Sequence, residues 1–167
     1  MGLNNMPATY EPIATYTAAS NQTSIAFSSL GAYTDIVAVF DGLSTSGAGN
    51  TLAMVFNSDA NSAYSATRVQ GNGTSATSAR VTSDPTVAIV GDSERTNAII
   101  SIMNYTNTTT YKTSLSRYNT MDAGDARTGA YVQLRSSTSA ITTVTFSMPS
   151  AQIATTSTIT LYGIKAA

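Results

Sequence analysis

The chain has 167 residues, enough for one domain with a hydrophobic core, and only 10% of them are charged. Its net charge of −1 gives no electrostatic attraction toward nucleic acids or anionic membranes, and no run reaches the roughly 20 apolar residues of a membrane span. The chain has no His and no Cys, which removes the commonest general base, thiolate chemistry and the usual zinc ligands. We therefore expect a protein that is not an enzyme and that binds no cofactor, metal, nucleic acid or membrane.

Hydroxyl side chains dominate the composition. Ser and Thr account for 50 of the 167 residues. This proportion is typical of β-strands whose outward faces carry hydroxyls instead of charges. A weakly charged surface of this kind suits a protein that is held in a fixed assembly.

The first twelve residues are predicted to form an irregular arm. Pro7 and Pro12 cannot donate to a β-ladder, and the adjacent asparagines favour a turn. Two interpretations stay open. The arm is a frayed terminus, or it docks on a neighbouring subunit through Leu3, Met6 and Tyr10.

Short segments with alternating apolar residues follow, at intervals of about 8–15 residues. These predicted strands cover residues 13–18, 23–28, 33–41, 52–56, 64–70, 86–90, 98–105, 111–118, 129–135, 143–148 and 158–164. The segment at 33–41 is apolar on both faces, which predicts burial between two layers. Stretches rich in Gly, Ser and Asn predict loops at 42–50, 71–79 and 119–128.

The C-terminal stretch, residues 140–165, is the most regular part of the chain. Val144 and Phe146 alternate with threonines until Pro149 ends the first strand, and Ile159 and Leu161 alternate with threonines in the second. A terminal strand this regular is expected inside a sheet, because a free end otherwise frays.

No segment keeps a helical period over three turns, so the fold is predicted to be all-β. The strand number and spacing favour a jelly-roll-like antiparallel β-sandwich. We expect a single sandwich domain over residues 13–167 behind a docking arm at residues 1–12.

One segment has the oxygen-ligand spacing of a calcium loop. Asn57, Asp59 and Asn61 alternate as such ligands do, but Ser62 and Arg68 stand where that motif has Gly and Glu. The alternative is a turn in which these side chains bond the local backbone, and this is the interpretation we favour.

Four acidic residues could in principle supply paired carboxylates of the kind used in glycoside hydrolysis. They are Asp92, Glu94, Asp122 and Asp125. All four fall in predicted loops, and nothing in the sequence brings two of them together. Solvation of loops is the simpler interpretation.

Two stretches resemble a group of β-sandwich structural proteins of tailed phages, especially those of marine and cyanobacterial hosts. The C-terminal AITTVTFSM…TSTITLYGIK resembles their closing strands, which end in GS-aliphatic-x-LYGI; Thr156–Ser157 replaces the Gly–Ser. The earlier match begins at Ser24 and ends in a turn similar to their fNgDsg.NYs, with Ser58 in place of the usual Gly. Together the two stretches cover about half of the chain.

The resemblance implies a virion protein, often a homotrimer, located on the outer capsid surface or on the tail. A compact chain with a short arm favours a capsid decoration (cement) protein, whose partners are the major capsid protein and other copies of itself. Such a protein binds only the assembled shell and so stabilises it by mass action. The alternative is a tail or head-fibre appendage module that contacts the host surface or glycans.

Overall fold

The computed structural model describes residues 9–47, 49–122 and 124–165. Within these residues the regular structure consists of β-strands and one short 3-10 helix, η1 (Asn61–Ala63). The strands are β1 (Tyr10–Thr17), β2 (Ser24–Phe27), β3 (Asp35–Gly42), β4 (Asn50–Phe56), β5 (Tyr64–Gly71), β6 (Ala76–Thr82), β7 (Thr86–Val90), β8 (Thr96–Ile102), β9 (Lys112–Asp122), β10 (Asp125–Arg135), β11 (Val144–Ser147) and β12 (Thr158–Ile164).

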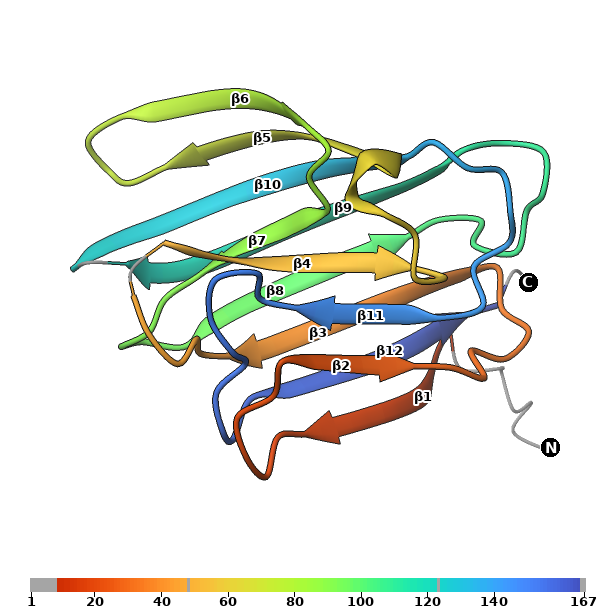
Figure 1. The fold of residues 1–167 in the computed structure, drawn as a ribbon, viewed down its shortest axis with the longest axis horizontal. Coiled ribbons are helices and arrows are strands. Elements are labelled where there is room, and N and C mark those ends of the chain that lie inside the picture. Colours follow the sequence, from red (N-terminus) through yellow and green to blue (C-terminus); the bar gives the residue numbers. More distant parts are fainter. Residues whose placement is uncertain (1–8, 48, 123, 166–167) are drawn as a thin grey trace, which may run out of the picture.

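The strands form two antiparallel sheets that pack face to face (Figure 1). The larger sheet has eight strands in the order β1-β12-β3-β8-β9-β10-β5-β6, and the smaller has four in the order β2-β11-β4-β7. The predicted all-β, single-domain antiparallel sandwich is therefore confirmed.

Eight of the strands have the connectivity of a jelly roll. They form the half-sheet β1-β12-β3-β8 and the whole small sheet β2-β11-β4-β7. The chain changes sheet at each step from β1 to β4, again between β7 and β8, and again between β11 and β12. Neighbouring strands therefore come from distant parts of the chain, as in other double-sheet Greek-key folds.

The other four strands form two inserted hairpins that widen the large sheet. The β5–β6 hairpin lies between β4 and β7 in the sequence, and the β9–β10 hairpin lies between β8 and β11. Because β9 pairs with β8 and β10 pairs with β5, the two hairpins join into one extension of the sheet. Figure 1 shows this extension at the top of the view, beyond the jelly-roll strands, and β7 contacts its strands β9 and β10.

The hydrophobic core lies between the two sheets. On β3, Ile36, Ala38 and Phe40 are fully buried and face the small sheet. Phe27 and Phe146 of the small sheet meet edge to face, with ring centroids 6.3 Å apart. The core arises from alternating positions of both sheets, as the period-2 pattern predicted.

The predicted burial of the third strand between two layers is correct for only one face. Val37 is buried, but Val39 is partly exposed on the opposite side of β3. Within the described residues no second layer covers that side. Strand β3 therefore has apolar residues on both faces, although only one of its faces is covered by another sheet.

The predicted interior position of the last strand is confirmed, since β12 lies between β1 and β3. Its predecessor β11 belongs to the other sheet, between β2 and β4. Gly163 of the LYGI sequence lies directly under the Tyr33 ring, where a Cβ would come within 2.3 Å of a ring atom. Tyr33 in turn donates to Glu11, which also accepts a hydrogen bond from Lys165.

The prediction of a loop is wrong for two segments, because each contains strand residues whose side chains are mostly polar. Residues 71–79 contain the start of β6, an edge strand whose side chains are nearly all polar or small, so it shows no apolar alternation. Residues 119–128 form the tight β9–β10 hairpin, in which Asp122 and Asp125 are directly opposite. The turn is closed by Gly124 at φ 84°, a conformation that glycine adopts without strain.

The boundary predicted for the N-terminal arm is also wrong. Strand β1 begins at Tyr10, and Pro12 pairs in register with Tyr162. Proline is tolerated there because β1 is the edge of the sheet and a bulge follows between Pro12 and Ala14. The predicted arm therefore overlaps β1 at residues 10–12, and residues 1–8 lie outside the described residues.

Polar side chains attach the inserted hairpins to the small sheet. Gln133 of β10 is fully buried and donates to the carbonyl oxygens of Met54 and Pro85, at 3.0 and 2.7 Å. Its own side-chain oxygen accepts from Ser114 at 3.2 Å. Ser116 donates to the carbonyl oxygen of Val87 on β7. These contacts satisfy backbone carbonyls at the edge of the small sheet.

We predict that Gly163→Ala destabilises the fold by about 1–3 kcal/mol, because the new methyl group must displace the Tyr33 ring. Urea unfolding of both proteins measures the change. Gly71→Ala is the matched control: it is also a strand glycine, and its nearest neighbouring atom would lie 3.7 Å from the new Cβ. Equal stability of Gly163→Ala and Gly71→Ala would contradict the role of Gly163.

We predict that Gln133→Leu lowers the free energy of unfolding by about 2–4 kcal/mol, because the buried Met54 carbonyl and the Ser114 hydroxyl lose their side-chain partner and the Pro85 carbonyl keeps only the N–H of Met54. Thr113→Ala, on an exposed position of β9, should change it by less than about 0.5 kcal/mol. Thermal or urea unfolding compares the two. An unchanged free energy of unfolding in Gln133→Leu would mean that apolar contacts, instead of these hydrogen bonds, join the sheets.

Candidate docking surface

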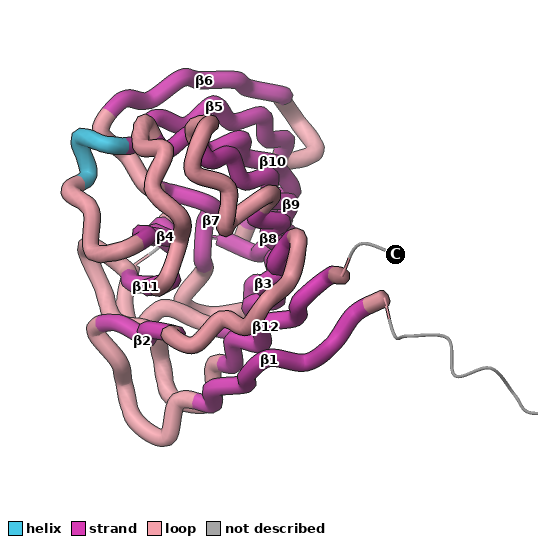
Figure 2. The backbone as a smooth tube through the Cα atoms, turned by 90° about the vertical axis from the view of Figure 1, so that its right-hand side faces the viewer, coloured by secondary structure: helices cyan, strands magenta, loops and turns pink. Residues whose placement is uncertain are grey.

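The large sheet has one face turned toward the small sheet and one turned away from it, here called the outer face. Figure 2 shows the large sheet side-on, with the small sheet packed against one face only. Among the described residues, no strand or helix packs over the outer face. The aliphatic side chains on the outer face form a group that we call the apolar patch: Val37, Val39, Val69, Ile99, Leu115 and Val132.

The polarity of β9 is inverted relative to an ordinary sandwich strand. Its inward positions include Ser114, Ser116 and Thr120, all buried, whereas Leu115 and Met121 point outward and are exposed. A strand that only had to cover a core would place its aliphatic residues inward. The inward hydroxyls bond the small sheet or one another, so the aliphatic residues are left on the outer face.

Strand β10 repeats the same inversion. Gln133 and Arg135 are buried on the inward side, whereas Val132, the residue before Gln133, is 49% exposed on the outward side. Because β10 pairs with β9 in register, Val132 lies directly opposite Leu115, which is 45% exposed. Large apolar side chains in contact with one another on an exposed sheet face mark an interaction surface.

The register of five strands aligns the patch into two rows across the sheet. One row runs from Val37 through Ser101, Leu115 and Val132 to Thr67, by successive pairing of β3, β8, β9, β10 and β5. The neighbouring row runs from Val39 through Ile99, Arg117 and Ala130 to Val69. The apolar patch is therefore continuous across residues that are far apart in the sequence.

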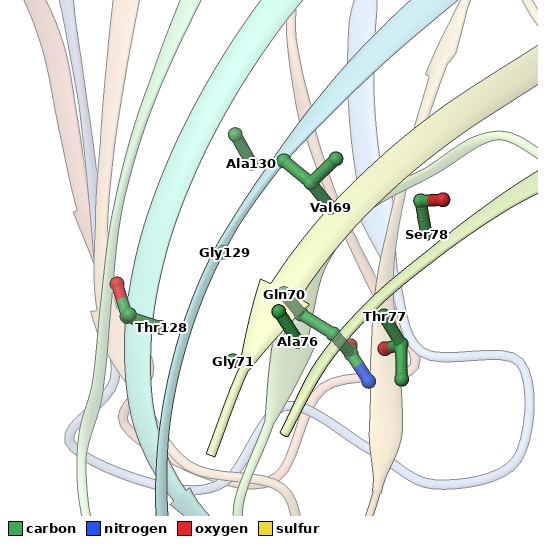
Figure 3. Close-up of a pocket in the computed structure, with 9 residues that line it drawn as sticks. All are labelled: Val69, Gln70, Gly71, Ala76, Thr77, Ser78, Thr128, Gly129 and Ala130. Atoms are coloured by element: carbon green, nitrogen blue, oxygen red, sulfur yellow. The ribbon is translucent and has the colours of Figure 1, made fainter. Parts of the chain in front are cut away.

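Shallow hollows lie along these rows. The one in Figure 3 has a volume of about 470 Å³ and is formed by β5, β6 and β10, with Val69 and Ala130 at one side and Thr128 at the other. Gly71 and Gly129 also line it. A second hollow of about 350 Å³ lies between Tyr10 and the aliphatic rows. Their linings can hold apolar side chains of a partner, but they offer no acid–base pair.

Of the three predicted partner contacts in the arm, the structure describes one. Tyr10 begins β1, is 55% exposed, and packs edge to face on Tyr162 with ring centroids 6.4 Å apart. It lines the second hollow together with Val37 and Leu115. Leu3 and Met6 lie outside the described residues.

The calcium-like spacing at Asn57 and Asp59 forms a structural turn. Asn57 accepts hydrogen bonds from the backbone N–H groups of Thr142 and Thr143 and donates to the carbonyl oxygen of Ala140. Asp59 accepts from Arg135 at 2.5 Å. Its neighbour Ser58 has φ 59°, in the region that favours glycine, the residue usual at this position of the resembled motif. Among the described residues, no group of three or more acidic side chains could hold a metal ion.

The sequence left open whether any acidic residues meet, and the backbone now brings one pair together. Asp122 and Asp125 face each other across the β9–β10 turn. Asp92 lies in the bend before β8, where it accepts from Ser93, and Glu94 lies in the same bend. No hollow lined by a described pair of carboxylates accompanies these residues.

A buried ionic cluster closes the ends of β9 and β10. Lys112 and Arg135 are cross-strand neighbours, each 1% exposed. Lys112 donates to the carbonyl oxygens of Thr110 and Thr138, and Arg135 donates to Asp59 and to the carbonyl oxygen of Ser139. Burial, and then the charge of Arg135, lower the pKa of Lys112. Every contact of this cluster holds a loop, so its role is structural.

Burial also raises the pKa of two inward tyrosines. The pKa of Tyr64 is raised by burial, although its hydroxyl is hydrogen-bonded to the backbone of Phe56. The pKa of Tyr131 is raised for the same reason, and the adjacent Arg68 guanidinium acts in the opposite direction. Tyr64 lines a shallow hollow beside Leu134, but its hydroxyl accepts from the backbone N–H of Phe56 and donates to the carbonyl oxygen of the same residue, so it is not a candidate proton donor to a substrate.

The residues of the apolar patch were not singled out from the sequence. The signal that could have found them is the segment 112–121, where aliphatic and polar residues alternate. Period-2 alternation identifies two faces but does not say which one is buried. In β9 the polar face is the buried one.

Comparison with known families, with curated proteins and with solved structures finds no match to this chain. None of the helical structure in the described residues could cross a membrane.

We predict that the stability of the protein rises with pH as Lys112 loses its proton. Its pKa is lowered in the folded state from an ordinary value of 10.5, so the unfolded chain binds the proton more tightly. The free energy of unfolding should increase as the pH passes the lowered pKa and approaches 10.5, and Lys112→Met should lack this increase. Urea unfolding from about pH 7 to pH 10 measures both curves.

The comparison with Lys112→Met is needed because the tyrosines act in the opposite direction. The raised pKa values of Tyr64 and Tyr131 make stability fall at higher pH, and they do so in both proteins. The difference between the two curves therefore isolates Lys112. Parallel curves would contradict the prediction.

Proposed function

We propose that this protein is a non-enzymatic structural component of a phage virion, a decoration (cement) protein on the outer surface of the capsid with the major capsid protein as its partner. The observation that carries the proposal is the inverted polarity of β9 and β10. Leu115 and Val132 are exposed on the outer face while Gln133 is buried. A protein that functions alone in solution loses solubility through such a face, whereas a subunit of an assembly covers it.

The scaffold suits a passive load-bearing role. The inserted hairpins are attached to the small sheet by buried hydrogen bonds, and the loops around Asn57 and Lys112 are closed by further ones. A surface held this firmly loses little conformational entropy on binding. The resemblance of the C-terminal and Asn57 segments to phage β-sandwich proteins supports the same role.

The mechanism would be selective binding. A decoration protein that binds only the assembled shell adds its binding free energy to the stability of that shell, by RT ln(1 + [L]/Kd). No bond is made or broken, so the absence of a paired acid and base in the hollows of the outer face is compatible with this role. The appendage role on a tail or head fibre is the alternative that the following experiment separates.

We predict that antibodies against this protein label the heads of virions that carry its gene, when the virions are examined by immunogold electron microscopy. Virions lacking the protein should release their DNA at lower temperature, because the shell loses the binding free energy of its decoration. Label restricted to the tail would contradict the capsid role and support the appendage. Virions without label or protein would contradict both.

A further inference from the structure

We propose that the outer face of the large sheet is the surface by which one copy of this chain binds a second copy. The inference rests on the proposed structural function, and it identifies a second copy of the chain as the partner of the apolar patch. The patch centres on Ile99, Leu115 and Val132, with Val69 at one end.

The area of the face matches what a stable association needs. Eight strands spaced about 4.8 Å apart, each with about seven residues rising about 3.4 Å, give a face of roughly 900 Å². A specific interface of standard size covers about 800 Å² on each partner. The whole face, with the apolar patch at its middle, is therefore about as large as a standard interface.

The composition of four adjacent strands of the face, β8, β9, β10 and β5, is that of an interface core, whereas the neighbouring β3 carries Asp41 at an outward position. Aliphatic side chains lie at the middle of the face, and Arg117 lies between Ile99 and Ala130. The described outward side chains of β8, β9, β10 and β5 include no carboxylate and no lysine. Arginine is enriched in interface cores, whereas Lys, Glu and Asp are depleted.

A second copy is the occupant that this composition fits. A strongly acidic partner would require several cations, but these four strands present only Arg117 on the outward side. In the next row along the strands, Asn97, Asn119 and Thr128 are aligned by the register and offer neutral oxygen acceptors. Another copy of the face therefore brings both the apolar surface for the patch and acceptors for the guanidinium.

Sheet faces of this kind also pack well on one another. Two β-sheets pack face to face at a spacing of about 10 Å when their side chains interdigitate. The hollow beside Leu115 lies between the two rows of the apolar patch, and the hollow beside Val69 borders the end of the second row. Ridges of one copy can fill hollows of another.

The first test is the mass of the purified full chain in solution, measured by analytical ultracentrifugation. We expect a multiple of 17.3 kDa, the mass of one chain. Val132→Asp should weaken the association at least about a hundredfold, because it buries an unpaired carboxylate in the interface. Tyr111→Asp is the matched control: Tyr111 is 56% exposed in the loop before β9, outside the apolar patch, so its association should be unchanged.

The second test places a single cysteine on or off the face, which is possible because the chain has no cysteine of its own. In Val69→Cys, alkylation should slow as protein concentration rises, and in Tyr111→Cys it should not. A wild-type chain that stays monomeric at its highest soluble concentration would overturn the inference. So would Val132→Asp with undiminished association, or alkylation at position 69 that is independent of concentration.

The outcomes separate this inference from the proposed function. A monomeric protein that still labels virion heads would refute copy–copy binding and leave the capsid role intact. An oligomer that assembles through the outer face but is absent from virions would support copy–copy binding and refute the capsid role. Circular dichroism of Val132→Asp and Tyr111→Asp confirms that both remain folded.

Discussion

The hydrogen bonds between inward side chains of β9 and β10 and the backbone of the small sheet determine much of this structure. Gln133 and Ser116 reach carbonyl oxygens at the edge of the small sheet, so this edge is satisfied without a further strand. The cost is that the inward face of the extension is polar. Its aliphatic residues, such as Leu115 and Val132, consequently lie on the outer face. The attachment of the extension and the exposure of the apolar patch are thus two results of one arrangement.

The two ends of the large sheet are protected in different ways. At one edge β1 carries Pro12 and a bulge, which leave no regular ladder for another strand. At the other edge β6 carries mostly small and polar side chains, with Arg80 among them. Such edges discourage pairing in the plane of the sheet, whereas the outer face remains apolar. Association through the face instead of through an edge follows from this contrast.

The buried charged side chains of this protein hold loops in place. Lys112 and Arg135 lie side by side with three backbone carbonyls and Asp59 around them, and among the residues described the only carboxylate in hydrogen-bond contact with either is Asp59. Such an arrangement costs desolvation energy, which is reflected in the lowered pKa of Lys112. The loops that it holds connect the inserted hairpin to the jelly-roll strands, so this energy is spent on fixing the extension in place.

The sequence by itself determined the fold class, most strand positions and the interior place of β12, because alternation and turn residues are local properties. It also indicated the turn at Asn57. Tertiary structure alone decided that β11 and β12 belong to different sheets, that the polar segments at β6 and around Asp122 are strands, and that the hairpins join. It also decided which face of β9 is buried. Pairing between strands distant in sequence leaves no local signal, and a period of two is the same whichever face lies inside.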